Sequence, residues 1–339
     1  MRGEVAFVSP ARAKKKYKTT AETAKKKEDV QTMLQSIIVV AQPVISLFLM
    51  MAVGFVLEKK GHLSENLAGK LSFILLYVGA PCVLVDSLQK LEGGAATIPV
   101  IWAGIGLCCL YFLVAITASR FFWRKADPDK RDALRFGCVF PNCSFMGLPL
   151  MLSIYGPYGA IYAVPIIAVF NVLQWTYGVA MMGGRDQVNL KKAILNPGTL
   201  SVAVGLGLFM LEWTLPAPIG MTVSYLGGIN TPLAMLIIGA QMARTDLFST
   251  FRRKDLYFVS LLKLFVFPAL FTLAALPFGA EKSLMVALVL MTACPVAGVT
   301  GILAQLYNRD ASSAAQSVSL TTLLSLLTLP LIAAVMAQI

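Results

Sequence analysis

Long apolar stretches separated by short polar segments dominate the chain from about residue 37 to its end. Ten of these stretches approach or exceed the roughly 20 residues that a helix needs to cross the hydrocarbon core of a bilayer. They cover approximately residues 37–57, 68–88, 97–118, 133–154, 160–182, 196–215, 223–243, 256–276, 283–306 and 314–337. The pattern therefore predicts an all-α polytopic membrane protein with ten transmembrane helices and no soluble domain.

Two of the stretches, at matching places in the two halves of the chain, are each interrupted by a proline at mid-membrane depth. Pro141 interrupts the fourth in Phe-Pro-Asn-Cys-Ser, and Pro295 interrupts the ninth in Ala-Cys-Pro-Val-Ala. A proline removes one backbone donor and clashes with the preceding turn, so both helices should break there. Unpaired backbone groups survive at membrane depth only around a cavity. Broken helices at matching places in two halves of a membrane protein indicate the substrate site of a transporter.

The spacing of these prolines predicts an internal duplication. Pro295 follows Pro141 by 154 residues, and Pro232 of the seventh stretch follows Pro81 of the second by 151. Five stretches precede the polar segment 183–195 and five follow it. Because each unit then holds an odd number of helices, the two repeats must have inverted topology.

The basic residues are distributed unevenly between alternate loops. One set of loops carries 17 lysines and arginines, whereas the other set carries only Lys90 and Lys282. By the positive-inside rule the first set is cytoplasmic, which places both termini of a ten-helix chain outside. The net charge of +12 is thus mostly a sign of topology, and we expect no nucleic-acid partner. The 17 residues are Lys59, Lys60, Lys70, Arg120, Arg124, Lys125, Lys130, Arg131, Arg135, Arg185, Lys191, Lys192, Arg244, Arg252, Arg253, Lys254 and Arg309.

Residues 1–32 do not fit this orientation, because nine lysines and arginines there would have to be exported. The segment lacks an apolar core that ends at a cleavage site, so it is not a recognisable signal peptide. Two explanations stay open: a start-site extension before a natural start at Met33, or a basic, disordered tail. We expect the first five-helix repeat in residues 33–182, a cytoplasmic loop in 183–195 and the second repeat in 196–339.

Composition excludes several other classes of protein. With 57% hydrophobic and 14% charged residues, and a mean hydropathy of +0.74, the chain is no ordinary soluble domain. Its six cysteines show no CxxC spacing, and there is a single histidine, so no metal site and no nucleophile with its base is indicated. We expect no enzyme activity and no cofactor. A nucleotide-binding motif is also missing, so energy would come from a gradient, with H⁺ and Na⁺ both open as the coupling ion.

Asn142, directly after Pro141, is the first candidate for contact with a substrate. A carboxamide at an unwound helix can donate to an anionic oxygen without a buried charge. The half-helix that begins near Ser144 would point its positive dipole end at the same place. The alternative is that Asn142 only satisfies the broken backbone of its own helix.

Further candidates are weaker individually. Around the second break they are Cys294, Pro295 and Thr300. Asn171 in the fifth stretch could face the same cavity. Interhelical packing and hydrogen bonding explain these residues equally well. Lys263 lies well inside the eighth stretch, and a charged residue within the membrane usually indicates a functional role. The alternative is that its side chain extends to the membrane interface, where water solvates the charge. Asp86, near the outer end of the second stretch, is an acidic candidate for proton coupling, with a surface position as its alternative.

These features resemble the auxin efflux carrier family, which includes the plant PIN-FORMED transporters and bacterial permeases for malate and malonate. The resemblance covers about residue 33 to the C-terminus, and the short central loop is similar to that of the bacterial members. It rests on the stretches Pro141-Asn-Cys-Ser-Phe-Met-Gly-Leu-Pro-Leu150, Asn230-Thr-Pro-Leu-Ala-Met-Leu-Ile-Ile-Gly-Ala240, Leu303-Ala-Gln-Leu-Tyr-Asn-Arg-Asp310 and Ser319-Leu-Thr-Thr-Leu-Leu-Ser-Leu-Leu-Thr-Leu-Pro330.

The resemblance implies that helices 1, 2, 6 and 7 form a scaffold and that the others form a moving transport domain. It also implies that the broken helices 4 and 9 of the inverted repeat cross, and that Asn142 approaches the substrate carboxylate near the crossing of Pro141 and Pro295. Alternating access of the elevator type would follow. The bile-acid symporters share this general architecture and use sodium, but no clear acidic sodium site is present here.

We therefore predict a secondary transporter for a small organic anion, such as malate, malonate or an auxin-like acid, in a bacterial inner membrane. A homodimer through the scaffold helices is left open. The alternatives are a sodium-coupled symporter of the bile-acid type, a channel, and a membrane protein without transport activity. An enzyme lacks the residues it would need, and a receptor would be expected to carry a signalling domain. A channel is harder to exclude, because broken helices also line pores.

Overall fold

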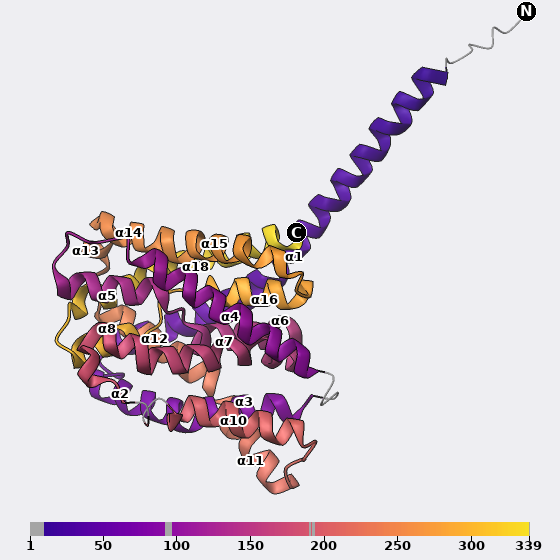
Figure 1. Cartoon of the computed structure of the whole chain (residues 1–339). Coiled ribbons are helices and arrows are strands. Elements are labelled where there is room, and N and C mark those ends of the chain that lie inside the picture. Colours follow the sequence, from indigo (N-terminus) through magenta and orange to yellow (C-terminus); the bar gives the residue numbers. More distant parts are fainter. Residues whose placement is uncertain (1–9, 92–96, 190, 192–193, 339) are drawn as a thin grey trace, which may run out of the picture.

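The computed structural model describes residues 10–91, 97–189, 191 and 194–338, and its named elements in these ranges are all helices (Figure 1). The all-α expectation is thereby confirmed. The first half of the chain contains α1 (Pro10–Lys59), α2 (Glu65–Ile74), η1 (Leu75–Gly79), α3 (Ala80–Gln89), α4 (Ile98–Ser119), α5 (Pro128–Val139), η3 (Cys143–Gly147), α6 (Leu148–Tyr155), η4 (Gly156–Tyr158), α7 (Gly159–Leu173), η5 (Gln174–Gly178) and α8 (Val179–Gly183).

The second half continues the bundle with a similar series of elements. It contains η6 (Arg185–Gln187), α10 (Pro197–Met210), α11 (Ala217–Gly228), α12 (Asn230–Arg244), α13 (Leu247–Arg252), α14 (Lys254–Leu261), η7 (Leu262–Val266), α15 (Phe267–Ala275), η8 (Leu276–Phe278), α16 (Lys282–Thr292), α17 (Val299–Leu306) and α18 (Ala311–Gln338). In Figure 1, α3, α10 and α11 form one side of the bundle and α14 and α15 the opposite side.

Seven helical runs among the described residues are long and apolar enough to cross a membrane. Two more helices, α10 and α16, are apolar but shorter. The run Cys143–Gly183 joins the end of the fourth predicted stretch to the fifth. Helix length alone therefore does not reproduce the predicted count of ten, because prolines divide the fourth and ninth stretches into short pieces and α10, in the sixth, has only 14 residues.

Helix α1 is much longer than the apolar part of its sequence. Its apolar run is Ile37–Lys59, but the helix begins at Pro10, and Figure 1 shows its first part projecting away from the bundle. The expected boundary at residue 32 thus falls inside one helix, and residues 1–9 lie outside the described part of the chain. The natural start at Met33 stays a prediction.

Two glycines allow α1 and α12 to pack with their backbones almost in contact. A Cβ atom added to Gly239 would lie 1.9 Å from the carbonyl oxygen of Met51, and one added to Gly54 would lie 2.1 Å from that of Leu236. Small residues permit this approach between membrane helices, which associate mainly through van der Waals packing. At the end of the pair with the basic loops, the guanidinium of Arg244 binds both carboxylate oxygens of Glu58, at 2.9 and 2.8 Å.

Candidate functional site

The two proline-broken helices meet at their breaks, as the family resemblance implies. Helix α5 ends at Val139 and helix α16 at Thr292, and the chain continues as a helix only from Cys143 and Val299. Between these ends the two segments pair as an isolated antiparallel bridge, Pro141 with Val296. We call this pairing the crossing.

Backbone hydrogen bonds hold the crossing together. The amide of Asn142 donates to the carbonyl oxygen of Pro295 at 2.8 Å, and the amide of Ala297 donates to that of Phe140 at 3.1 Å. The amide of Val296 donates to the hydroxyl of Thr321 on α18 at 3.1 Å. Each broken helix thus satisfies groups that the other exposes, which is the condition for irregular backbone at membrane depth.

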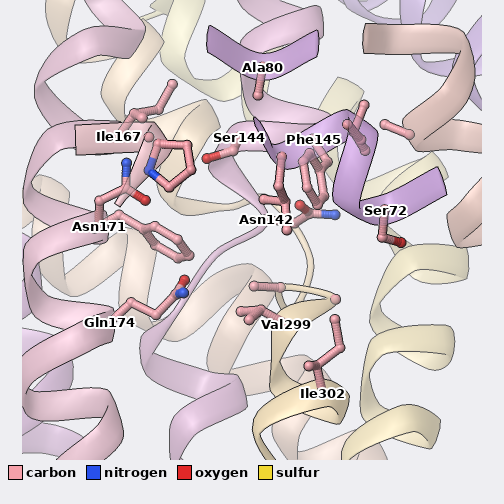
Figure 2. Close-up of a pocket in the computed structure, with 18 of the residues that line it drawn as sticks. Ser72, Ala80, Asn142, Ser144, Phe145, Ile167, Asn171, Gln174, Val299 and Ile302 are labelled. Carbon is pink, nitrogen blue, oxygen red and sulfur yellow. The ribbon is translucent and has the colours of Figure 1, made fainter. Parts of the chain in front are cut away.

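A cavity of about 230 Å³ lies beside the crossing (Figure 2). Its wall is mostly apolar, and no Asp, Glu, Lys or Arg of the described residues lines it. In Figure 2, Asn171 and Gln174 lie on one side of the cavity, Ser72 lies on the opposite side, and Asn142 and Ser144 lie between them. The polar residues that line it are Ser72, Asn142, Ser144, Asn171, Gln174, Asn196, Ser201 and Gln241.

Asn142 lines this cavity, and its side chain carries a hydrogen-bond donor without a partner. Asn142 is 3% exposed, and its Nδ2 atom is buried without a hydrogen-bond partner. Its backbone carbonyl, in contrast, accepts the amides of Met146 and Gly147 at 3.2 and 3.0 Å and so starts η3. A buried amide without a partner costs about 1–3 kcal/mol, so a ligand that accepts from Nδ2 would recover this free energy.

Asn196 supplies a second such donor at the start of α10. Its Oδ1 atom caps the helix by accepting the amides of Gly198 at 2.7 Å and Thr199 at 3.3 Å. This leaves its Nδ2 atom buried and without a partner. The carboxamide of Asn171 lies against the same turn, since a Cβ atom on Gly198 would lie 2.5 Å from its Nδ2 atom. Carboxamides from the fifth and sixth predicted helices thus meet here.

The structure brings together part of the predicted site. Pro141, Asn142, Ser144 and Asn171 all line the cavity. Asn196, Ser72 and Gln241 also line it, and the sequence analysis did not select them. The Asn-Pro-Gly turn at 196–198 was a usable signal, because a capping Asn exposes a second polar atom beside a helix N-terminus.

The remaining candidates lie outside the cavity wall. Pro295 is part of the crossing, whereas the thiol of Cys294 is buried and lies 3.5 Å from the carbonyl oxygen of Leu290. Thr300 is fully buried, with a hydroxyl that has no partner. Asp86 pairs with Lys90 at 2.6 Å near the end of α3, and Lys263 is fully buried elsewhere in the bundle.

The cavity extends from the crossing toward the end of the bundle that carries the basic loops. Asn196 and Pro197 open helix α10 at that end, Gln241 lies three residues before Arg244, and Leu306 lies three before Arg309. On α10 the lining residues stop at Ser201, and on α12 they begin at Ala234. The cavity therefore reaches toward one face of the bundle.

Comparison with known proteins gives a consistent result along nearly the whole chain. A family model described as "Membrane transport protein" matches residues 39–191 and 185–333, two segments that meet at the loop between the predicted repeats. An uncharacterized transporter of Methanocaldococcus jannaschii is 29% identical over 308 residues, or 85% of this chain and 96% of that protein. An uncharacterized transporter of Methanothermobacter thermautotrophicus is 24% identical over 297 residues, or 86% of this chain and 96% of that protein.

Proposed function

We propose that this chain, which belongs to the membrane transport protein family of auxin efflux carrier-type permeases, is a secondary transporter for a small organic anion. The main support for the proposal is Asn142, a residue of the cavity wall at the crossing whose buried Nδ2 donor has no hydrogen-bond partner. A carboxylate that accepts a hydrogen bond from Nδ2 forms a charge-assisted hydrogen bond, which is stronger than one between neutral groups.

The chemistry of the wall supports a small, partly apolar acid such as malate, malonate or an auxin-like acid. Uncharged amides and hydroxyls orient an anion without holding it as tightly as an arginine would, and a carrier must also release its substrate. The apolar remainder of the wall suits a carbon skeleton. The volume of about 230 Å³ leaves room for a small acid.

We further propose ten transmembrane helices in two inverted repeats, with elevator-type alternating access. Supporting this, the seven long runs, the short helices α10 and α16, and the broken segment α5 match the ten predicted stretches in order. Helices α1, α3, α10, α11 and α12 would form the scaffold, within which α1 packs on α12 and α3 on α10 and α11. The crossing and its cavity would move against this scaffold.

Counterflow in proteoliposomes tests the function. Vesicles loaded with unlabelled malate, malonate or indole-3-acetate should take up the matching labelled acid transiently above equilibrium, and uptake should saturate. Counterflow requires a site that reorients with bound substrate, so a channel shows flux without it. Absence of uptake for every organic anion would contradict the proposed substrate class.

Cysteine labelling tests the orientation of the cavity. We expect Ile302→Cys, which lies on the cavity wall with 46% of its surface exposed, to react with a membrane-impermeant maleimide added from the cytoplasmic side. Substrate should slow this reaction. The background would carry serine at Cys82 and Cys109, the two cysteines that are not buried.

Leu327→Cys on α18 is the matched control. Leu327 is 66% exposed but lies outside the cavity, so its thiol should face lipid and stay unlabelled, because maleimides react with the hydrated thiolate. Labelling of Ile302→Cys only from the outer side would reverse the proposed orientation. If both thiols reacted equally with the maleimide, residue 302 would be no more accessible to water than a position outside the cavity, and this result would contradict an aqueous cavity beside Ile302.

A further inference from the structure

Lys263 lies in η7 with no exposed surface, and its ammonium group binds the end of a broken helix. The Nζ atom donates to the carbonyl oxygen of Thr292 at 2.7 Å and to the hydroxyl oxygen of Tyr111 at 3.1 Å. Thr292 is the last residue of α16, the half-helix that leads into the crossing. None of the ion pairs in the described part of the chain includes Lys263.

Tyr111 extends this contact to the other broken helix. Its hydroxyl donates to the carbonyl oxygen of Val139 at 3.2 Å, and Val139 is the last residue of α5. The ammonium group also lies 5.6 Å from the centre of the Tyr111 ring. One chain of groups therefore connects a single cation to the C-terminal carbonyls of both half-helices, where the helix dipoles place partial negative charge.

Lys263 and Tyr111 occupy equivalent places in the two predicted repeats. Lys263 follows Tyr111 by 152 residues, and Thr292 follows Val139 by 153, close to the offsets of 151 and 154 between the prolines. Each side chain binds the terminal carbonyl of the half-helix that follows it in its own repeat. The first repeat uses a neutral hydroxyl at this position, and the second uses a cation.

In sodium-coupled transporters, the C-terminal ends of half-helices coordinate the coupling cation. We propose that the ammonium group of Lys263 is a built-in cation that takes this place, so that the crossing keeps its shape and anion exchange needs no sodium. Lys263 does not line the cavity, so it acts as a positioning residue through the crossing. This inference rests on the proposed transport function.

The first test uses the normal protein. Its thermal unfolding in detergent and its anion counterflow should be the same in sodium chloride as in choline chloride. A requirement for sodium in either measurement would overturn the inference. The unfolding measurement does not depend on the substrate, so it remains decisive even if no organic anion is transported.

The second test replaces the cation chemically. Lys263→Ala removes a propylammonium group from a fully buried site. We expect a lower unfolding temperature and about tenfold slower exchange, because the substitution removes a hydrogen bond from a charged group. Millimolar propylammonium should restore both, whereas 1-propanol, which has a similar shape and no charge, should not. Lys263→Arg should keep more activity than Lys263→Met.

Two results would contradict the role of the charge. Equal rescue by 1-propanol and propylammonium would show that Lys263 only fills space. Full stability and exchange in Lys263→Met would show that the half-helix ends need no cation. If Lys263→Ala cannot be purified, the comparison of Lys263→Arg with Lys263→Met decides between the same alternatives.

Discussion

Asn142→Asp is expected to abolish anion exchange while leaving the protein folded. The substitution keeps the size of the side chain but replaces the buried Nδ2 donor by a carboxylate oxygen that repels an anionic substrate. Asn142→Ala should weaken substrate binding by about 1.5–3 kcal/mol, the typical contribution of a hydrogen bond to a charged group, which corresponds to about 10- to 150-fold. Initial counterflow rates over a range of substrate concentrations measure both effects.

Asn230→Ala is the matched control for this prediction. Asn230 is also fully buried, and both of its side-chain polar atoms lack hydrogen-bond partners, but it does not line the cavity. Its removal should leave exchange intact and keep or raise stability, because no hydrogen bond is lost. If Asn142→Asp exchanges organic anions at the normal rate, Asn142 is not a substrate contact and the proposed site is wrong.

Gly239→Val is expected to prevent α1 and α12 from packing, with little folded protein recovered. Any Cβ atom at residue 239 would overlap the carbonyl oxygen of Met51 at 1.9 Å, and the overlap involves backbone, which cannot rotate away. Overpacking against side chains already costs about 1–3 kcal/mol, so the cost here should exceed that range. Size-exclusion profiles and thermal unfolding of the detergent-solubilised protein provide the measurement.

Gly207→Val separates this effect from the general cost of valine in a helix. Gly207 lies within α10, and no heavy atom lies within 4 Å of an added Cβ atom there. Its substitution should therefore leave the unfolding temperature nearly unchanged. Equal loss of folded protein in both variants would mean that the approach of α1 to α12 does not limit stability.

The apolar pattern was sufficient to predict an all-helical membrane protein. Stretches of about 20 apolar residues predict helices, and the breaks at Pro141 and Pro295 follow from the geometry of proline alone. The family assignment likewise came from sequence stretches around Pro141 and Asn230, and the family match confirms it. Length and pattern did not predict the continuation of α1 back to Pro10, because the basic stretch before residue 33 lacks the run of apolar residues that predicts a membrane helix.

The candidate site was only partly predictable. Asn142 could be selected because it follows a proline break directly, and it lies on the cavity wall. Cys294 is adjacent to Pro295 and Thr300 follows it by five residues, but both are buried away from the cavity wall, because sequence proximity does not say which face of a helix meets a cavity. Asn196 was missed because it reaches the wall from a separate helix start, a contact that exists only in three dimensions.

The sequence by itself determined where helices form, where two of them break, and which loops carry the basic charge, since each of these depends on local chemistry and spacing. Only the tertiary structure decided which polar groups meet. Asn142, Asn171 and Asn196 line one cavity, and Lys263 reaches Thr292 and, through Tyr111, Val139, because helices distant in sequence pack side by side. Burial without a partner, which makes the Asn142 donor available to a ligand, is a property of that packing.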